Sequence, residues 1–204
     1  MSMSEFEELL REDLLGTCSL TSQQTGLLET HFGLLNRWNR TLNLTSVRDM
    51  KDAVTRHYCE SLFLAAHLPE NCKSVADLGS GAGFPGIPLA ILRPQCKVTL
   101  IESHQRKAVF LKEATRHLGN VLVQAKRAEA VSERFDWLVS RAVAPKEVLR
   151  FVPGLASNLA LLLAREDASK LLVDNKLRFE ELVPMPWLPR SVLLLGSYVS
   201  RETC

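Results

Sequence analysis

The chain has 204 residues, of which 46% are hydrophobic and 24% are charged, and its formal net charge is +2. This length and composition predict one sizeable core, and the absence of repeats and low-complexity segments excludes a fibrous or disordered protein. The apolar stretches are too short to span a membrane and no targeting segment is visible, so we expect a cytoplasmic protein without membrane contact. The five cysteines form no C-x-x-C pair, so we expect neither a metal site nor a disulfide framework.

Helical periodicity covers residues 4–15, 22–40 and 49–68, and Pro69 ends the third helix. Acidic side chains occupy the first thirty residues, and a basic group follows them: Arg37, Arg40, Arg48, Lys51 and Arg56. If these residues lie on one face of the folded protein, they form a patch that binds phosphate. The simpler interpretation of any single Lys or Arg is a solvated surface charge. We expect residues 1–70 to form a helical extension that packs on a domain of residues 71–204.

After Pro69, strand and helix patterns alternate along the chain. Strands are predicted at residues 74–78, 97–101, 121–123, 137–140 and 159–163, and helices near Pro88, Lys107, Lys146 and Lys170. This alternation predicts an α/β fold, a Rossmann-like parallel sheet with helices on both faces. A last strand at residues 191–199 would be antiparallel in a methyltransferase version of this fold.

A glycine-rich turn follows the strand at residues 74–78 and opens a helix. Gly81, Gly83 and Gly86 satisfy the dinucleotide pattern G-x-G-x-x-G. However, Pro85 removes one backbone donor that a pyrophosphate would use, and Asp77 would repel a diphosphate. A carboxylate at this point suits a cofactor with an ammonium and a carboxylate group. We therefore predict S-adenosylmethionine as the cofactor and a class I methyltransferase as the fold.

Glu102 stands at the end of the second strand, where a doubly wound sheet places an acidic residue on the cofactor ribose. The alternative is that Glu102 caps the helix that begins near His104. Because Glu102 occurs together with Asp77 and the glycines, we favour its interpretation as a cofactor-binding residue. The cofactor-binding residues predicted from this pattern are Asp77, Gly79, Gly81, Gly83 and Glu102.

Four motifs in order resemble the glucose-inhibited division protein B family. They are residues 38–46 (WNRTLNLTS), 56–61 (RHYCES), 77–89 (DLGSGAGFPGIPL) and 140–142 (SRA). The resemblance implies a bacterial enzyme that methylates a guanine N7 of small-subunit (16S) ribosomal RNA, acting on that RNA or on the assembling small subunit, as a monomer. It also implies that Phe84 lies against the cofactor, that Ala128 and Glu129 hold its adenine end, and that Arg141 lies between cofactor and guanine.

The residues at the end of the fourth predicted strand limit which kinds of atom the enzyme can methylate. This strand ends in Ser140, Arg141 and Ala142 rather than in the Asn/Asp-Pro-Pro-aromatic motif of many enzymes that methylate exocyclic amines. No cysteine lies between Cys96 and Cys204 to attack a pyrimidine ring. Oxygen, small-molecule and ring-nitrogen targets remain, and guanine N7 fits best because it needs no deprotonation. Arg141, at the carboxyl end of this strand, is the predicted catalytic residue.

The polar segment after the second helix favours RNA over a closed small-molecule pocket. His57 is also a candidate, although a hydrogen-bonded structural histidine is the simpler interpretation. Family members carry Lys-Gly where this chain has Ala164 and Arg165, and Arg165 is a candidate substitute for that lysine. A small-molecule methyltransferase and a non-catalytic module that binds S-adenosylmethionine or RNA stay open as alternatives. The predicted RNA-binding residues are Arg40, Asn43, Thr45, Ser46, Arg48, His57, Arg127 and Arg165.

Overall fold

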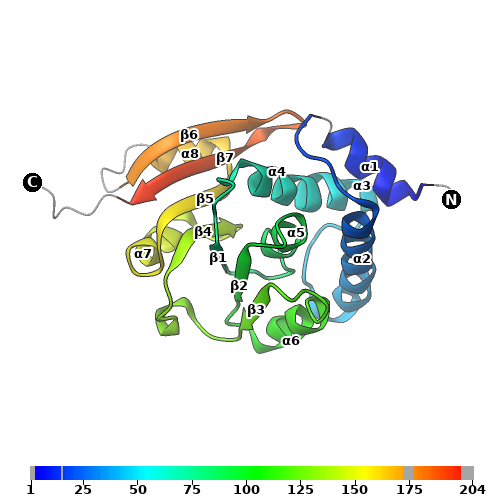
Figure 1. Ribbon diagram of the computed structural model, residues 1–204, viewed down its shortest axis with the longest axis horizontal. Coiled ribbons are helices and arrows are strands. Elements are labelled where there is room, and N and C mark those ends of the chain that lie inside the picture. Colours follow the sequence, from blue (N-terminus) through cyan, green and yellow to red (C-terminus); the bar gives the residue numbers. More distant parts are fainter. Residues whose placement is uncertain (1–2, 15, 172–176, 199–204) are drawn as a thin grey trace, which may run out of the picture.

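A seven-stranded sheet forms the centre of the computed structural model, which describes residues 3–14, 16–171 and 177–198 (Figure 1). The strand order is β3-β2-β1-β4-β5-β7-β6. The strands are β1 (Ser74–Leu78), β2 (Lys97–Ile101), β3 (Val121–Gln124), β4 (Phe135–Arg141), β5 (Ala156–Ala164), β6 (Leu177–Met185) and β7 (Leu188–Tyr198). The first five strands are parallel, and β7 is antiparallel to both β5 and β6. The predicted Rossmann-like sheet is confirmed, and Val199 of the predicted last strand lies outside the described residues.

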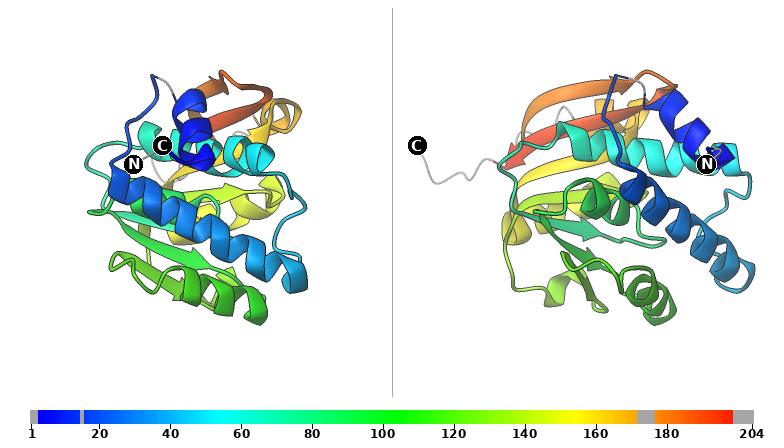
Figure 2. Two further views of the ribbon diagram at one scale, coloured as in Figure 1. Left: turned by 90° about the vertical axis from the view of Figure 1, so that its right-hand side faces the viewer. Right: turned by 45° about the vertical axis from the view of Figure 1, so that its right-hand side comes forward.

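Helices cover both faces of this sheet (Figure 2). They are α1 (Glu5–Asp13), α2 (Ser22–Leu42), α3 (Met50–Ala53), α4 (Glu60–His67), α5 (Gly86–Leu92), α6 (Gln105–Ala114), α7 (Pro145–Leu155) and α8 (Arg165–Leu171). Val139 of β4 belongs to an apolar cluster that includes residues of α2, α4, α5 and α6, whereas its neighbour Leu138 belongs to a second cluster that includes residues of α7 and α8. This alternation follows from the two-residue period of a strand and produces a core on each face. Among the described residues, no helix is both long and apolar enough to cross a membrane.

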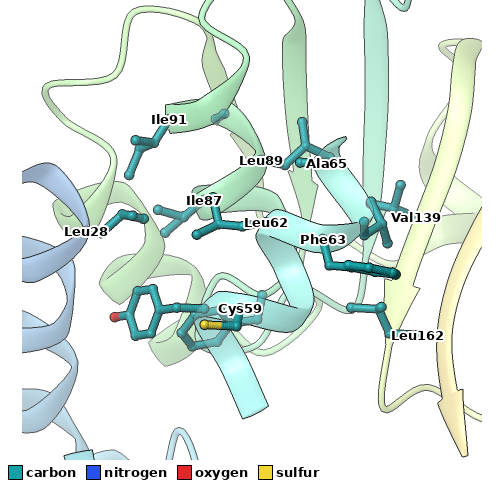
Figure 3. Close-up of a cluster of buried hydrophobic side chains, with 14 of the residues drawn as sticks. Leu28, Cys59, Leu62, Phe63, Ala65, Ile87, Leu89, Ile91, Val139 and Leu162 are labelled. Carbon is teal, nitrogen blue, oxygen red and sulfur yellow. The ribbon is translucent and has the colours of Figure 1, made fainter. Parts of the chain in front are cut away.

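Among the N-terminal helices, α4 packs onto the sheet, and α2 packs onto α5 and α6. Leu28 of α2 lies near Ile87 of α5, and Leu62 of α4 lies beside Ile87 (Figure 3). Towards the sheet, Phe63 of α4 meets Val139 and Leu162. One apolar core therefore runs across residue 70, and the division of the chain at that residue stays a prediction.

The predicted helix over residues 49–68 is helical throughout but changes type in its middle. Between α3 and α4, residues Val54–Cys59 form a π-helical segment. The segment buries His57 and Tyr58 against Phe84 of the glycine-rich turn. Single π turns inside helices are common at functional sites, where the extra residue changes the direction of a side chain.

Candidate functional site

Two cavities lie side by side at the carboxyl ends of the parallel strands. The first, of about 450 Å³, is lined by Thr45, Ser46, His57, Gly81 and Arg141 among others, and we call it the His57 cavity. The second, of about 380 Å³, is lined by Arg127, Ala128 and Glu129 among others, and we call it the Glu129 cavity. Gly79 and Val143 line both cavities, so the two adjoin at the start of the glycine-rich turn. This edge is where open α/β sheets bind ligands.

The glycine-rich turn borders the cavities, and its backbone is left-handed at three positions. Gly79, Gly81 and Gly83 have φ values of 71°, 56° and 90°. A Cβ at Gly83 would lie 2.4 Å from Cδ1 of Ile87, whereas at Gly81 the nearest heavy atom would be 3.7 Å away. Gly81 therefore faces open space beside the His57 cavity, and Gly83 is required for packing on α5.

Asp77 lies beneath this turn and is fully buried. The Gly86 amide at the start of α5 donates to its Oδ2 at 3.0 Å, and its Oδ1 has no partner among the described residues. Burial raises the pKa of Asp77 to about 7. Asp77 lines neither cavity, so the structure shows it holding α5 to the turn, and direct contact with a cofactor ammonium stays a prediction.

Glu102 connects the turn to α6. Its Oε2 accepts from the Gly81 amide at 2.9 Å, and its Oε1 accepts from the His104 amide at 2.7 Å. The helix-capping alternative therefore holds for one of the two oxygens, since Oε1 accepts from the amide of His104, the residue before α6. Each oxygen keeps a second lone pair for a ribose hydroxyl, and that contact stays a prediction.

Arg141 ends β4 and forms an ion pair that the sequence did not predict. Its Nε donates to Oε2 of Glu60 at 2.8 Å, and only 7% of the Glu60 side chain is exposed. Burial raises the pKa of Glu60, and the neighbouring guanidinium opposes this effect. Ala142 follows with a φ of 61°, a left-handed conformation that costs a residue with a Cβ about 1–2 kcal/mol. Such local strain is typical of functional sites.

His57 is held by the segment that follows α2. Its Nε2 lies 2.7 Å from the Thr45 hydroxyl oxygen, and that oxygen accepts from the Val47 amide at 3.1 Å. The Asn39 side chain accepts from the Thr45 amide and donates to the Thr45 carbonyl oxygen. Burial lowers the pKa of His57 to about 3, and Arg141 adds to this effect, so the ring is neutral. The structural interpretation of His57 therefore has direct support.

The predicted site residues fall into three groups. Those that line a cavity are Gly79, Gly81, Phe84, Thr45, Ser46, His57, Arg127, Ala128, Glu129 and Arg141. Those that lie beneath the turn and line neither cavity are Asp77, Gly83 and Glu102. Those that are exposed and line neither cavity are Arg40, Asn43, Arg48 and Arg165.

Two further cations belong to the site, since Arg56 and Lys107 line the His57 cavity. In the sequence, Arg56 was visible in the basic group and in the RHYCES motif, and Lys107 in a predicted helix. Glu60 was visible as part of the RHYCES motif, but its partner Arg141 is 81 residues away in the chain. The sequence held no signal for that pairing.

A family model described as rRNA small subunit methyltransferase G, or GidB, matches residues 24–164. The chain belongs to the GidB family. The Ribosomal RNA small subunit methyltransferase G of Xanthomonas axonopodis pv. citri (strain 306) is 48% identical over 172 residues, which cover 82% of this chain and 77% of that protein. The resemblance seen in the four motifs is confirmed.

Solved structures show the same fold at low identity. The ribosomal protein L11 methylase of Lactobacillus delbrueckii subsp. bulgaricus has a TM-score of 0.58 and 17% identity, covering 72% of this chain and 80% of that one. Fibrillarin of Aeropyrum pernix, solved with natively bound S-adenosyl-L-methionine, has a TM-score of 0.52 and 14% identity, covering 63% and 68%. This GidB chain shares the fold of these methyltransferases, one of which holds S-adenosyl-L-methionine.

The residues at the strand ends fit that cofactor. The Glu129 cavity joins the His57 cavity at Gly79, so an extended molecule can lie across the turn with one end in each. Gly81 leaves space in the His57 cavity that a side chain would fill. The unpaired Oδ1 of Asp77 and the lone pairs of Glu102 supply acceptors under the same turn. A zwitterionic cofactor with ribose hydroxyls matches this set of donors and acceptors.

Proposed function

We propose that this chain transfers a methyl group from S-adenosylmethionine to N7 of a guanine in small-subunit ribosomal RNA. The substrate is the RNA itself or the assembling small subunit, and an enzyme with this substrate works in the cytoplasm. Membership of the GidB family supports the substrate class. The choice of N7 rests on the lining of the His57 cavity.

The His57 cavity contains cations but no general base. Arg56, Lys107 and Arg141 line it, and no carboxylate does so among the described residues. The neutral His57 ring is engaged through Nε2, and its Nδ1 is buried. A hydroxyl or an exocyclic amine must lose a proton when it is methylated, whereas N7 attacks with an in-plane lone pair and loses none. A site without a proton acceptor therefore favours a ring nitrogen.

The chain's contribution is positioning. When bound, S-adenosylmethionine supplies an electrophilic methyl group on a sulfonium. The Glu129 cavity holds the adenine end through Ala128 and Glu129, Glu102 takes the ribose, and the glycine-rich turn fixes the amino-acid end. Arg141, held by Glu60, orients the guanine at the junction. Alignment of reacting groups can supply about 7–11 kcal/mol of barrier reduction without acid–base chemistry.

The proposed RNA backbone contacts lie partly outside the cavities and partly at their lining. Arg40, Asn43 and Arg48 are exposed around the end of α2, and Thr45 and Ser46 carry the same surface into the His57 cavity. Arg127 and Arg165 are exposed at the ends of other strands. Exposed cations of this kind position a nucleic acid through its phosphates, whereas the cavity selects the base.

The deciding experiment supplies purified protein with S-adenosylmethionine carrying a deuterated methyl group and with small-subunit RNA from cells that lack the gene. Nucleosides from digested RNA are then separated by mass spectrometry. We expect deuterated 7-methylguanosine at one site, from naked RNA or from small-subunit particles. Label in another nucleoside would overturn the N7 assignment, and label only in small molecules would establish the alternative class of substrate.

A further inference from the structure

A third cavity lies next to the His57 cavity, on its other side from the cofactor end. It measures about 450 Å³ and is lined by Arg56 and Glu60, by Arg141, and by residues 188–191 at the start of β7, including Arg190. We call it the Arg190 cavity. Arg56 and Arg141 line both the Arg190 and the His57 cavities, so the two are neighbours. The C-terminal hairpin thus reaches the reaction site.

The Arg190 cavity carries a surplus of positive charge. Three guanidinium groups line it, and its one carboxylate, Glu60, is already paired with Arg141. Arg56 and Arg190 are exposed, and the ion pairs of the described residues include neither. Arg165 is a fourth arginine near this cavity. It follows Ala164 of β5, which pairs with Ser191 of β7 in the sheet, and Ser191 lines the cavity. Concave sites lined by one sign of charge concentrate ligands of the opposite sign.

We propose that the Arg190 cavity binds a backbone phosphate of the RNA, next to the nucleotide whose base enters the His57 cavity. Arginine forks bind phosphate oxygens with two parallel hydrogen bonds, which sets position as well as affinity. When a base of the RNA occupies the His57 cavity, the phosphodiester groups of the same nucleotide must lie close by. A backbone phosphate is therefore the anion within reach of the Arg190 cavity. This inference rests on the proposed function and extends it to Arg56 and Arg190.

The shared Arg141 explains why such a contact matters for catalysis. Arg141 lines both cavities and is held by Glu60. A phosphate in the Arg190 cavity and a base in the His57 cavity would therefore both lie beside the Arg141 guanidinium. Holding the adjacent phosphate restricts the rotation of an unstacked nucleotide. An enzyme that must present a single ring edge to a methyl group gains rate from this restriction.

The test compares two double variants with the same change in net charge. Arg56→Ala/Arg190→Ala removes the proposed phosphate ligands, and Arg11→Ala/Arg150→Ala removes two exposed arginines on α1 and α7 that line neither the Arg190 nor the His57 cavity. Binding of a labelled small-subunit RNA fragment is measured by fluorescence anisotropy from 50 to about 300 mM salt, at saturating cofactor, with methylation followed in parallel.

We expect the Arg56/Arg190 variant to lose about one to two units of salt slope and to raise KM for RNA about tenfold. Its affinity for S-adenosylmethionine and its melting temperature should stay those of the wild type, because neither arginine lines the Glu129 cavity and neither forms an ion pair within the described part of the chain. Arg190→Lys should keep the salt slope but recover KM only in part, since lysine lacks the fork.

The outcomes separate this inference from the proposed function. If the wild type methylates the RNA and the two double variants behave alike, the phosphate site is wrong and the proposed function stands. If the wild type does not methylate small-subunit RNA in any form, the proposed function is wrong and this inference falls with it. A lowered melting temperature confined to the Arg56/Arg190 variant would assign these arginines to folding and would also overturn the proposal.

Discussion

Two glycines of the same turn make different contributions, and substitutions can separate them. Gly81 borders the His57 cavity with open space at its Cβ position, whereas a Cβ at Gly83 would collide with Ile87. We expect Gly81→Arg to stay folded, at a cost of about 1–2 kcal/mol for its left-handed backbone, and to lose cofactor binding because its side chain enters the cavity. Calorimetric titration with S-adenosylmethionine and a thermal melt measure the two effects.

Gly83→Ala is the matched control for this prediction. It adds a smaller group but forces the buried Ile87 side chain to shift, at a backbone φ of 90°, so we expect a greater loss of thermal stability than in Gly81→Arg. Cofactor binding that survives unchanged in Gly81→Arg would contradict the placement of the cofactor across this turn.

The Arg141–Glu60 pair gives a second prediction. Arg141→Ala leaves the Glu60 carboxylate buried without its partner, which we expect to cost about 3 kcal/mol of stability in addition to catalytic rate. The double variant Arg141→Ala/Glu60→Gln removes the stranded charge. It should regain most of the stability, measured by denaturant unfolding, while its methylation rate at saturating RNA stays low. Recovery of rate together with stability would show that Arg141 acts only through the fold.

The sequence predicts individual site residues but not the contacts between side chains that are distant in the chain. Arg141 was predicted because it follows an apolar strand, and it does line the cavity at the strand end. The pairing of Glu60 with Arg141 was missed because the two residues lie 81 positions apart in the chain. Asp77 was predicted at the cofactor, and that contact stays a prediction, whereas its bond from the Gly86 amide at the start of α5 was not predicted.

Among the elements, the end of α2 carries a further prediction. Asn43 ends the helix with a φ of 42°, a conformation that asparagine and glycine adopt with little strain. Asn43→Gly should therefore keep the melting temperature of the wild type. If the exposed amide contacts RNA as proposed, the same variant should bind RNA several-fold more weakly, with its cofactor affinity unchanged.

Asn43→Ala serves as the comparison variant. Alanine should lower stability by about 1 kcal/mol because a Cβ without a compensating polar group disfavours the left-handed C-cap. RNA affinity that is equal in the wild type and in Asn43→Gly would leave Asn43 as a helix terminator alone.

Two elements differ from the predicted pattern for physical reasons. Strand β6 was not predicted because Glu180, Glu181 and Pro184 interrupt its apolar alternation. It is an edge strand with irregular register against β7, and an edge tolerates both charge and proline. The π-helical segment before α4 was also not predicted, because a change from i→i+4 to i→i+5 hydrogen bonds requires no particular residue type.

Across the whole molecule, buried ionisable groups connect the N-terminal helices to the cofactor turn. Nδ1 of His31 on α2 lies 2.8 Å from the Tyr58 hydroxyl oxygen, and its Nε2 lies 3.1 Å from the Ala82 carbonyl oxygen. A carbonyl oxygen only accepts, so Nε2 carries the proton and Nδ1 accepts from Tyr58. Burial lowers the pKa of His31 to about 4. The turn beneath the cofactor site is therefore held by a histidine that must remain neutral.

His31 and Asp77 impose opposite pH dependences on folding. The unfolded chain protonates His31 below pH 6.5 but the folded chain does so only near pH 4, so its stabilisation is full above 6.5 and is lost as pH falls. The pKa of Asp77 is raised from 3.8 to about 7, so its burial costs nothing below 3.8 and destabilises increasingly as pH rises to 7. The two effects oppose each other between pH 4 and 6.5.

Single variants should reveal each effect as a change in slope relative to the wild type. From pH 4 to 6.5, we expect the unfolding free energy of Asp77→Asn to gain about 1.4 kcal/mol per pH unit on the wild type, and that of His31→Gln to lose a similar amount. Above pH 7 both differences should become constant. Urea unfolding at five pH values measures them, and parallel curves for all three proteins would show that neither group titrates differently in the folded and unfolded chain.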